Sequence, residues 1–450
     1  MDRALAYLER NRERFLGLLL DYLKIPSVSA QKRFHEDARR AAEFIRQRLH
    51  DAGFQTRVFD GKGLPTVHGW RSQDPKRPTL LVYGHYDVQP PDPLDLWETP
   101  PFEPTLLDGE IRARGSADDK GPSLALVLAA ECWSKGAGAL PLNLKVVIEG
   151  EEECGGDVVV QFVKKHKKEL AAEALVIADT SGWQRGTPAL CYGLRGIFAA
   201  EVTIEGPSRD LHSGSYGGTV ANPATALARL VATLHDEGGR VAVKGFYDGV
   251  TPPDAAERAR IAALDFEEGD HLAETGSPAL YGEEGFSTLE RKGARPTCEI
   301  NGIFGGYQGE GSKTIIPAKA GCKITCRIVP GQDPAKGFAA LERHLRKHCP
   351  PGVKLHVRKG HRAAAVYTDP ETPWAMRARA ALEGAFGRPA MLTREGGSIP
   401  VVNLFQKELG TQPLLLGTYA PGERAHSPNE RYYVDDFFAA IRTGIRLFGV

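Results

Sequence analysis

Several short apolar runs in this chain end directly in a histidine or a carboxylate. The run over residues 80–84 is followed by His85 and Asp87. In an extended backbone, residues two apart point to the same side, so these two side chains leave the tip of a strand together. A metal-bound histidine is usually oriented through its second nitrogen by a nearby carboxylate or carbonyl. Taken alone, such a pair is more often an ordinary turn at the end of a strand.

Two further places carry the same kind of residue. Asp118 and Asp119 lie in a glycine-flanked loop ahead of an apolar helical pattern. Aspartate is a favoured N-cap, so helix capping is an alternative explanation for either one. The apolar run over residues 144–148 leads into four glutamates within residues 149–153. An acidic run is usually a solvated surface, but this one directly follows a core strand.

Asp179 ends another apolar run, and His426 lies in a polar loop near the C-terminus. In open α/β sheets, ligands bind beyond the carboxyl ends of the strands. Two histidines and three or more carboxylates, without cysteines in matching positions, suit a pair of divalent ions such as zinc, manganese or cobalt. One carboxylate of such a centre bridges both ions, and the other ligands bind one ion each. The sequence therefore predicts a dinuclear metal site.

Eight segments of the chain resemble motifs of the M20 family of dinuclear metallopeptidases, in the order of that family. The likeness is greatest to the dipeptidase branch, that of the cytosolic non-specific dipeptidase and carnosinase-like enzymes. Because the segments span nearly the whole chain, the resemblance is specific. The segments are residues 84–90, 115–122, 152–155, 178–179, 192–196, 210–214, 393–400 and 425–427.

The resemblance implies a role for each ligand-type residue. His85 and Asp179 would bind one ion, and Glu153 and His426 the other. Asp118 would bridge both ions, and the peptide bond after it is typically cis in the family. The cofactor implied is a pair of divalent metal ions, zinc or manganese, with cobalt as a further option.

The general base and its neighbours are also assigned by the resemblance. Glu152 would take a proton from a water shared by the two ions and deliver it to the leaving amine. Three consecutive glutamates leave this choice open on chemistry alone, but the family pattern selects Glu152 and Glu153 over Glu151. Asp87 would hold the ring of His85.

Four residues outside the metal ligands are implied to contact the substrate. His212, in a glycine-rich loop, would stabilise the oxyanion, and in relatives with a lid this histidine reaches the active site of the partner subunit. Arg327 would bind the free carboxylate of the substrate through its planar guanidinium. The alternatives are a surface turn for His212 and a surface arginine for Arg327. Thr314 and Ser398 match substrate-contacting positions.

The element pattern predicts an α/β fold with two domains, as the length of 450 residues also suggests. From about residue 57 to 179, strands alternate with helices, which favours a mainly parallel sheet flanked by helices. After residue 193 the pattern changes to a smaller α+β insert, the lid of the family, which commonly dimerises. The expected bounds are residues 1–195 and 363–450 for the catalytic domain and 196–362 for the lid/dimerisation domain.

Composition limits the partners and the compartment. The 57 Lys and Arg residues balance the 57 Asp and Glu residues, so there is no general attraction to nucleic acid or to an anionic membrane. Seven cysteines, mostly in apolar contexts, favour reduced thiols in a cytosol. No window is apolar enough for a signal-peptide core or a membrane span. We expect a cytoplasmic homodimer that has neither nucleic acid nor membrane as a partner.

The functional hypothesis is metal-dependent hydrolysis of peptide bonds in dipeptides or short peptides with a free C-terminal carboxylate. The same metal centre serves deacylases of N-acyl amino acids and carboxypeptidases, which remain alternatives. A non-catalytic protein on the same fold would have lost a ligand or the base. A nucleotide-binding enzyme would need a phosphate-binding glycine pattern after the first strand, and the glycine-rich loops here do not form one.

Overall fold

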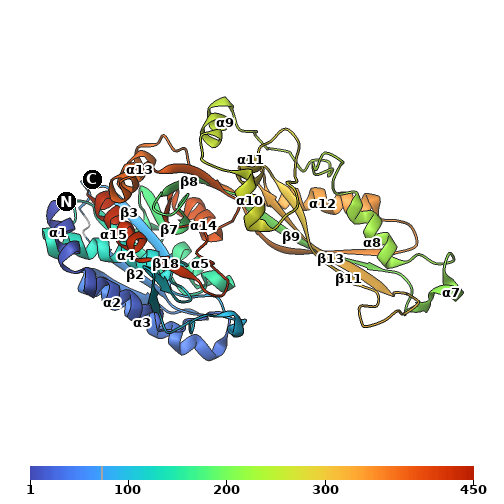
Figure 1. Ribbon diagram of the computed structural model, residues 1–450, viewed down its shortest axis with the longest axis horizontal. Coiled ribbons are helices and arrows are strands. Elements are labelled where there is room, and N and C mark those ends of the chain that lie inside the picture. The colour runs from blue at the N-terminus through green and yellow to red at the C-terminus, as the bar shows by residue number, and fades with distance from the viewer. Residues whose placement is uncertain (72–73, 450) are drawn as a thin grey trace. The chain divides into compact units, whose positions relative to one another are not determined.

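The computed structural model describes residues 1–71 and 74–449 and divides them into two compact units. The first unit comprises Met1–Tyr192, Thr368–Thr393 and Leu404–Val450, and the second comprises Gly193–Tyr367 and Arg394–Asn403. Both ends of the chain therefore belong to the first unit (Figure 1). The α/β class predicted from the sequence is confirmed.

The first unit is built on a mixed sheet with the strand order β1-β2-β6-β3-β7-β17-β8. Its four central strands, β6, β3, β7 and β17, run parallel, so their carboxyl ends meet at one edge. β16 pairs with β8, and a small separate sheet has the order β18-β5-β4. The strands are β1 (Gln55–Phe59), β2 (Thr66–Arg71), β3 (Thr79–His85), β4 (Thr105–Leu107), β5 (Glu110–Arg112), β6 (Asn143–Glu149), β7 (Ala174–Ser181), β8 (Ala189–Leu194), β16 (Met391–Glu395), β17 (Gln412–Tyr419) and β18 (Arg431–Tyr433).

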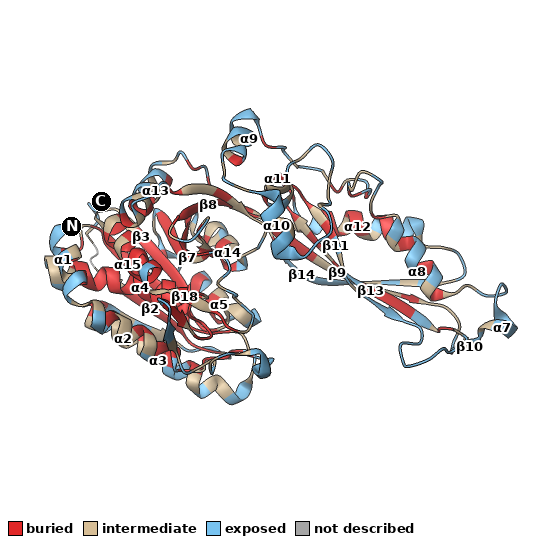
Figure 2. Cartoon of the chain, in the orientation of Figure 1, coloured by how far each residue is buried: buried red, intermediate tan, exposed pale blue. Residues whose placement is uncertain are grey.

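Helices cover this sheet, and the central one is α4 (Figure 2). Every residue of α4 is buried, as expected for a helix that is apolar on all sides over residues 124–130. α4 begins two residues after Asp118, so the loop of the predicted bridging ligand continues into the most buried helix. The helices are α1 (Asp2–Arg10), α2 (Arg12–Leu23), α3 (His35–Asp51), α4 (Lys120–Glu131), α5 (Val158–Lys165), α6 (Lys167–Leu170), α13 (Pro373–Phe386), α14 (Pro400–Leu409) and α15 (Val434–Phe448).

The second unit is an α+β structure with an antiparallel sheet of order β11-β13-β9-β14. Buried and more exposed residues alternate along β13, since Cys322, Ile324 and Cys326 are buried while Lys323 is exposed. The buried face packs on α8 and α12. The elements are β9 (Gly196–Glu205), β10 (Leu211–His212), α7 (Ser213–Tyr216), α8 (Pro223–Ala232), α9 (Ala255–Ala262), α10 (Glu268–Thr275), α11 (Thr288–Gly293), β11 (Thr297–Gly305), β12 (Ile315–Ile316), β13 (Lys319–Ile328), α12 (Pro334–His348), β14 (Lys354–Ala363) and β15 (Val366–Tyr367).

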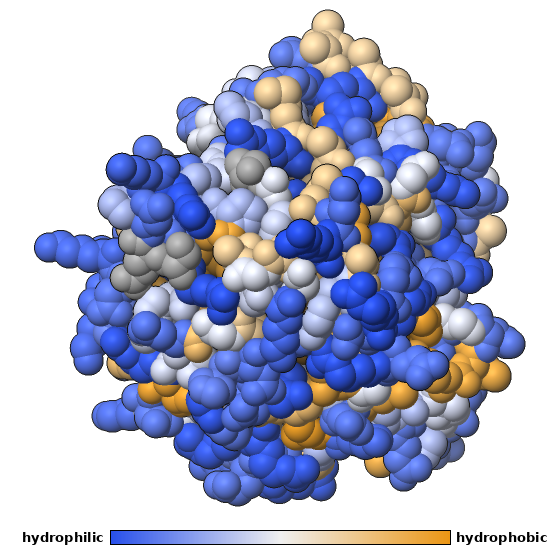
Figure 3. All heavy atoms as spheres, turned by 90° about the vertical axis from the view of Figure 1, so that its left-hand side faces the viewer, coloured by the Kyte–Doolittle hydropathy of each residue, from blue (hydrophilic) through white to orange (hydrophobic). Residues whose placement is uncertain are grey.

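The surface is mostly hydrophilic on the face shown in Figure 3, with apolar side chains in small separate patches. Among residues 1–71 and 74–449, no helix combines the length and the hydrophobicity needed to cross a bilayer.

Candidate metal centre

The predicted metal ligands come together at the carboxyl edge of the parallel strands. His85 is the last residue of β3, and Glu153 lies in a short 3-10 turn after β6. Asp179 lies two residues before the end of β7, so that strand continues further than the sequence pattern indicated. Asp118 belongs to the loop before α4, and His426 belongs to the loop between β17 and β18. All five residues are in the first unit.

These side chains form two groups of donor atoms, and Asp118 belongs to both. One group is His85, Asp118 and Asp179, and the other is Asp118, Glu153 and His426. Within each group the donor atoms lie within 4.8 Å of one another. His85 Nε2 is 3.1 Å from Asp118 Oδ1, whereas His426 Nε2 is 2.9 Å from Asp118 Oδ2. The two oxygens of one carboxylate thus face different groups, which is the geometry of a bridging ligand.

The charge balance of this edge favours bound cations. Burial raises the pKa of Glu152 to about 7 and that of Asp119 to about 8, and nearby carboxylates add to both shifts. The pKa of Asp179 is likewise raised well above its usual value by burial and by Asp118. A bound cation removes this mutual repulsion. The donors are imidazole nitrogens and carboxylate oxygens, a set that fits divalent ions such as zinc or manganese.

Asp87 is fully buried and positions two of the candidate ligands. His85 Nδ1 is 3.1 Å from the carbonyl oxygen of Asp87 and 3.4 Å from its carboxylate. With Nδ1 held in this way, Nε2 faces Asp118 and Asp179. The carboxylate of Asp87 also accepts a hydrogen bond from the backbone N–H of Glu153 at 3.1 Å, a contact that the sequence did not indicate.

Glu430 is a buried residue that the sequence analysis missed. Its Oε1 accepts hydrogen bonds from the N–H groups of Ala117 (2.9 Å) and Asp118 (3.1 Å). Its Oε2 accepts from the N–H of Gly115 (2.8 Å) and from Arg114 Nη1 (2.8 Å). One carboxylate therefore fixes the backbone of the Asp118 loop. Its position in a polar loop gave no sign of burial.

Two further contacts of the candidate ligands were not predicted from the sequence. The carboxylate of Asp119 accepts a hydrogen bond from the backbone N–H of His85 at 3.1 Å. The Asp118–Asp119 peptide bond is cis, as the family resemblance implied. Gln89 Nε2 donates to Glu153 Oε2 at 2.8 Å. Gln89 lies within one of the motif segments, which is the signal that could have identified it.

The loop that carries His426 has an unusual backbone. Arg424, His426 and Asn429 adopt φ angles of 60°, 62° and 64°, a region that residues other than glycine seldom occupy. The side chain of Asn429 anchors this loop, because its Oδ1 accepts from Glu98 N (2.7 Å) and its Nδ2 donates to Leu96 O (2.9 Å). An exposed histidine is thereby held in a defined place.

In the second unit, the structure brings His212 and Thr314 together. β10 pairs with β12 at His212, and Ser213 N donates to Thr314 O at 3.0 Å. His212 Nδ1 accepts hydrogen bonds from the N–H groups of Gly214 (3.0 Å) and Ser215 (3.3 Å). Because Nδ1 is an acceptor, the proton of a neutral ring is on Nε2. His212 therefore presents a hydrogen-bond donor at its exposed side.

The second unit also brings Arg327 and Ser398 together. Arg327 Nη1 donates to Ser398 Oγ at 2.8 Å, and Ser398 Oγ donates to the carbonyl oxygen of Arg195. Burial lowers the pKa of Arg195 to about 10, and the charge of Arg327 contributes to that shift. Two neighbouring guanidinium groups suit an anion such as a carboxylate. Arg195 lies in a motif segment, but its role was not predicted from the sequence.

Comparisons with known proteins identify the family of this chain. The model of peptidase family M20/M25/M40 matches residues 81–448. The chain is 31% identical to the Cys-Gly metallodipeptidase DUG1 of Saccharomyces cerevisiae, over 96% of this chain and 94% of that protein. It is 27% identical to the Beta-Ala-His dipeptidase of Rattus norvegicus, over 96% of this chain and 91% of that protein.

A solved structure is also similar, the M20 family metallo-carboxypeptidase Sso-CP2 from Sulfolobus solfataricus. Its TM-score is 0.87 and its identity 31%, over 97% of this chain and 98% of that one. The family match covers most of the chain, and the sequence likeness extends over almost all of it. The chain therefore belongs to peptidase family M20/M25/M40, in its dipeptidase branch, and is a metal-dependent peptidase.

Proposed function

We propose that this protein hydrolyses the peptide bond of dipeptides and short peptides that have a free C-terminal carboxylate. Two divalent ions, zinc or manganese, with cobalt as a substitute, would be held by five side chains. The observation that carries the proposal is the carboxylate of Asp118, whose two oxygens face two separate donor groups. The proposed ligands are His85, Asp118, Glu153, Asp179 and His426.

The proposed chemistry divides between the ions and the side chains. When bound, two divalent ions would lower the pKa of a shared water and would polarise the substrate carbonyl. Glu152 would be the general base that accepts a proton from the attacking water and later delivers it to the leaving amine. Asp87 keeps the ring of His85 oriented, and Glu430 keeps the Asp118 loop in place.

Residues of the second unit are proposed to bind the substrate. His212 donates from Nε2 to the carbonyl oxygen as its negative charge develops. Arg327 pairs with the C-terminal carboxylate, and Ser398 holds the guanidinium in position. Thr314, adjacent to the His212 turn, contacts the substrate backbone.

A carboxypeptidase acting on longer peptides is the second candidate. The likeness to the Sulfolobus metallo-carboxypeptidase favours it, because that structure matches as well as the sequences of the dipeptidases do. Both activities require recognition of a free carboxylate, so Arg327 serves either one. The length of peptide that is accepted distinguishes the two candidates.

The test is a substrate panel on enzyme that has been stripped with a chelator and reloaded with zinc, manganese or cobalt. The panel contains Cys-Gly, β-Ala-His, a tripeptide, a longer peptide and an N-acyl amino acid. Hydrolysis of dipeptides that requires added metal supports the proposal. Turnover of the N-acyl amino acid alone would replace it with a deacylase, and efficient release of C-terminal residues from the longer peptide would establish the carboxypeptidase.

We also propose that the protein works in the cytoplasm as a homodimer formed through its second unit. The cysteines are all free thiols and most are buried, which suits a reducing compartment. His212 is exposed, as a residue that acts across a subunit interface must be in the isolated subunit.

A further inference from the structure

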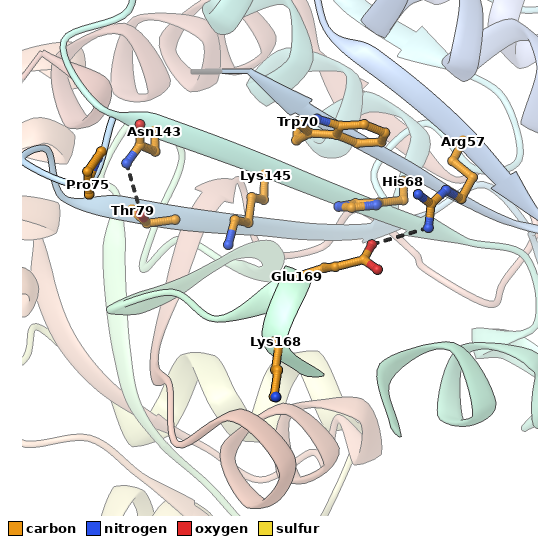
Figure 4. Close-up of a pocket in the computed structure, with 9 residues that line it drawn as sticks. All are labelled: Arg57, His68, Trp70, Pro75, Thr79, Asn143, Lys145, Lys168 and Glu169. Carbon is orange, nitrogen blue, oxygen red and sulfur yellow. Dashed lines mark hydrogen bonds and ion pairs between the residues drawn. The ribbon is translucent and has the colours of Figure 1, made fainter. Parts of the chain in front are cut away.

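A cavity of about 550 Å³ lies on one face of the first-unit sheet, over β1, β2, β6 and β3 (Figure 4). Its size is within the range of sites that bind small molecules. Nothing in the proposed peptidase mechanism uses it. The residues that matter for its chemistry are Arg57, His68, Trp70, Lys145, Lys168 and Glu169.

The register of the sheet explains why this face is polar. Arg57 pairs with His68 across β1 and β2, and Trp70 pairs with Lys145 across β2 and β6. Paired residues point to the same face, so all four side chains project on one side. Val67, which precedes His68 in sequence, belongs to the core on the opposite face. In an α/β sheet both faces are normally apolar beneath helices, and this part of the face is not.

His68 is the most unusual group in the cavity wall. It is 2% exposed, and neither ring nitrogen has a hydrogen-bond partner within residues 1–71 and 74–449. Its ring stacks on Trp70, with centroids 5.0 Å apart. A neutral imidazole has one donor and one acceptor nitrogen, and leaving both unmet in a buried position is unfavourable.

Burial keeps the ring of His68 neutral. Burial lowers the pKa of His68 to about 4. The charged and titratable groups that act on it are Glu169, Arg57, Lys145 and His166. A hydroxyl or an amide of a ligand could therefore supply one of the two hydrogen bonds that the ring lacks.

The cavity carries an excess of positive charge. Arg57 and Glu169 form an ion pair of 3.2 Å, which Figure 4 shows as a dashed line. Lys145 and Lys168 remain as further cations. Lys145 Nζ donates to the carbonyl oxygen of Ala171 at 2.6 Å, and burial lowers its pKa. An ammonium has three N–H donors, so Lys145 can still bind an anion.

We propose that this cavity binds a small aromatic carboxylate, with its carboxylate on Lys145 and its ring against Trp70 and His68. A polar substituent on the ring would supply one of the hydrogen bonds that His68 lacks. This ligand site is separate from the metal centre. Thr79 lines the cavity and His85 ends the same strand six residues later, a separation of about 20 Å at about 3.3 Å per residue.

The test is a calorimetric titration that measures the equilibrium binding of 4-hydroxybenzoate to the metal-loaded enzyme. Its neutral counterpart, 4-hydroxybenzamide, tests the need for the charge. The titrations are repeated with Arg327→Ala, because the proposed substrate site also binds carboxylates. Lys145→Met removes the proposed partner in the cavity, and Lys164→Met, an exposed lysine of α5 outside the cavity, is the matched control.

The expected result is saturable binding of 4-hydroxybenzoate that survives in Arg327→Ala and is about tenfold weaker in Lys145→Met, the usual effect of losing one charge-assisted hydrogen bond. Lys164→Met should bind as the parent does, and the benzamide should bind at least about tenfold more weakly than the benzoate. Binding that disappears in Arg327→Ala but persists in Lys145→Met would overturn the proposal. So would equal binding of the benzamide, or no saturable binding at all. If Lys145→Met does not fold, His68→Phe replaces it, with the same expected loss.

Discussion

Replacing Glu430 with glutamine tests whether this buried carboxylate positions the Asp118 loop. Each of its oxygens accepts two hydrogen bonds, from Ala117 N and Asp118 N on one side and from Gly115 N and Arg114 on the other. A glutamine keeps one oxygen and turns the other into an N–H donor. In either orientation two donors therefore lose their acceptor and face an amide N–H.

The structure gives the size of the expected effect. Glu430 and Arg114 are 0% and 1% exposed, so glutamine leaves a buried guanidinium without its anion. Breaking a buried pair by removing one partner costs about 3–5 kcal/mol, and each unsatisfied buried N–H about 1–3 kcal/mol. We expect the free energy of unfolding to fall by about 4 kcal/mol. Loss of a contact that orients a ligand should also weaken metal binding by about 10–100-fold.

Urea denaturation measures the first effect, and titration of the stripped enzyme with zinc or manganese measures the second. The control is Glu283→Gln, which breaks the bidentate pair with Arg295 in the second unit, where both contacts are 2.7 Å. That variant should lose stability and keep its metal affinity. If Glu430→Gln also keeps the parent metal affinity, Glu430 contributes only general stability, and the reasoning about the loop is wrong.

Four further changes test the proposals above. Glu152→Gln should retain its metal, measured by atomic absorption, and lose about 10²–10⁴-fold in kcat, because only proton transfer is removed; near-normal turnover would exclude Glu152 as the base. Arg327→Ala should lower kcat/KM for free dipeptides by about 10–100-fold and matter little for C-terminal amides, and equal losses would contradict its assignment. Mixing His212→Ala with Glu152→Gln should restore part of the activity if His212 acts across a dimer, whereas activity that stays at the sum of the two would place it within one subunit. Because the pKa of His68 is lowered to about 4 from 6.5, the unfolded ring takes up a proton between these values while the folded ring does not. The free energy of unfolding should therefore decrease as the pH is lowered through that window, by up to about 1.4 kcal/mol per pH unit. Urea denaturation of His68→Phe across pH should lack this contribution, and identical slopes in the parent and the variant would show that His68 does not titrate as described.

The sequence could predict the parts of this structure that depend on local patterns. Apolar runs that end in a ligand-type residue predicted the strands β3 and β6. The last residue of a parallel strand lies at the carboxyl edge of the sheet, where ligands bind. Apolar and polar residues alternate along β13, and burial follows that pattern because side chains in a strand change face at every step. The eight motif segments indicated the family, and the family match confirms it.

Contacts between distant segments could not be predicted in this way. In the sequence, Glu430 is an ordinary acidic residue of a polar loop. Only in the folded chain does it accept hydrogen bonds from the N–H groups of Gly115, Ala117 and Asp118. Arg195 and Arg327 are 132 positions apart, so no local pattern could indicate that their charges interact. The face with His68 and Lys145 requires the register of three strands, which hydrophobic periodicity does not supply.

The connection between the Asp118 loop and α4 has a consequence for how the protein responds when ions leave. The Asp118 loop continues into a helix whose residues are all buried, and Glu430 accepts hydrogen bonds from its backbone. The loop therefore has little freedom to move its carboxylates apart. Without ions, the carboxylates of the centre repel one another but cannot move apart to reduce this repulsion. Reloading should accordingly need little reorganisation, so that the stripped enzyme recaptures its ions without a slow conformational step.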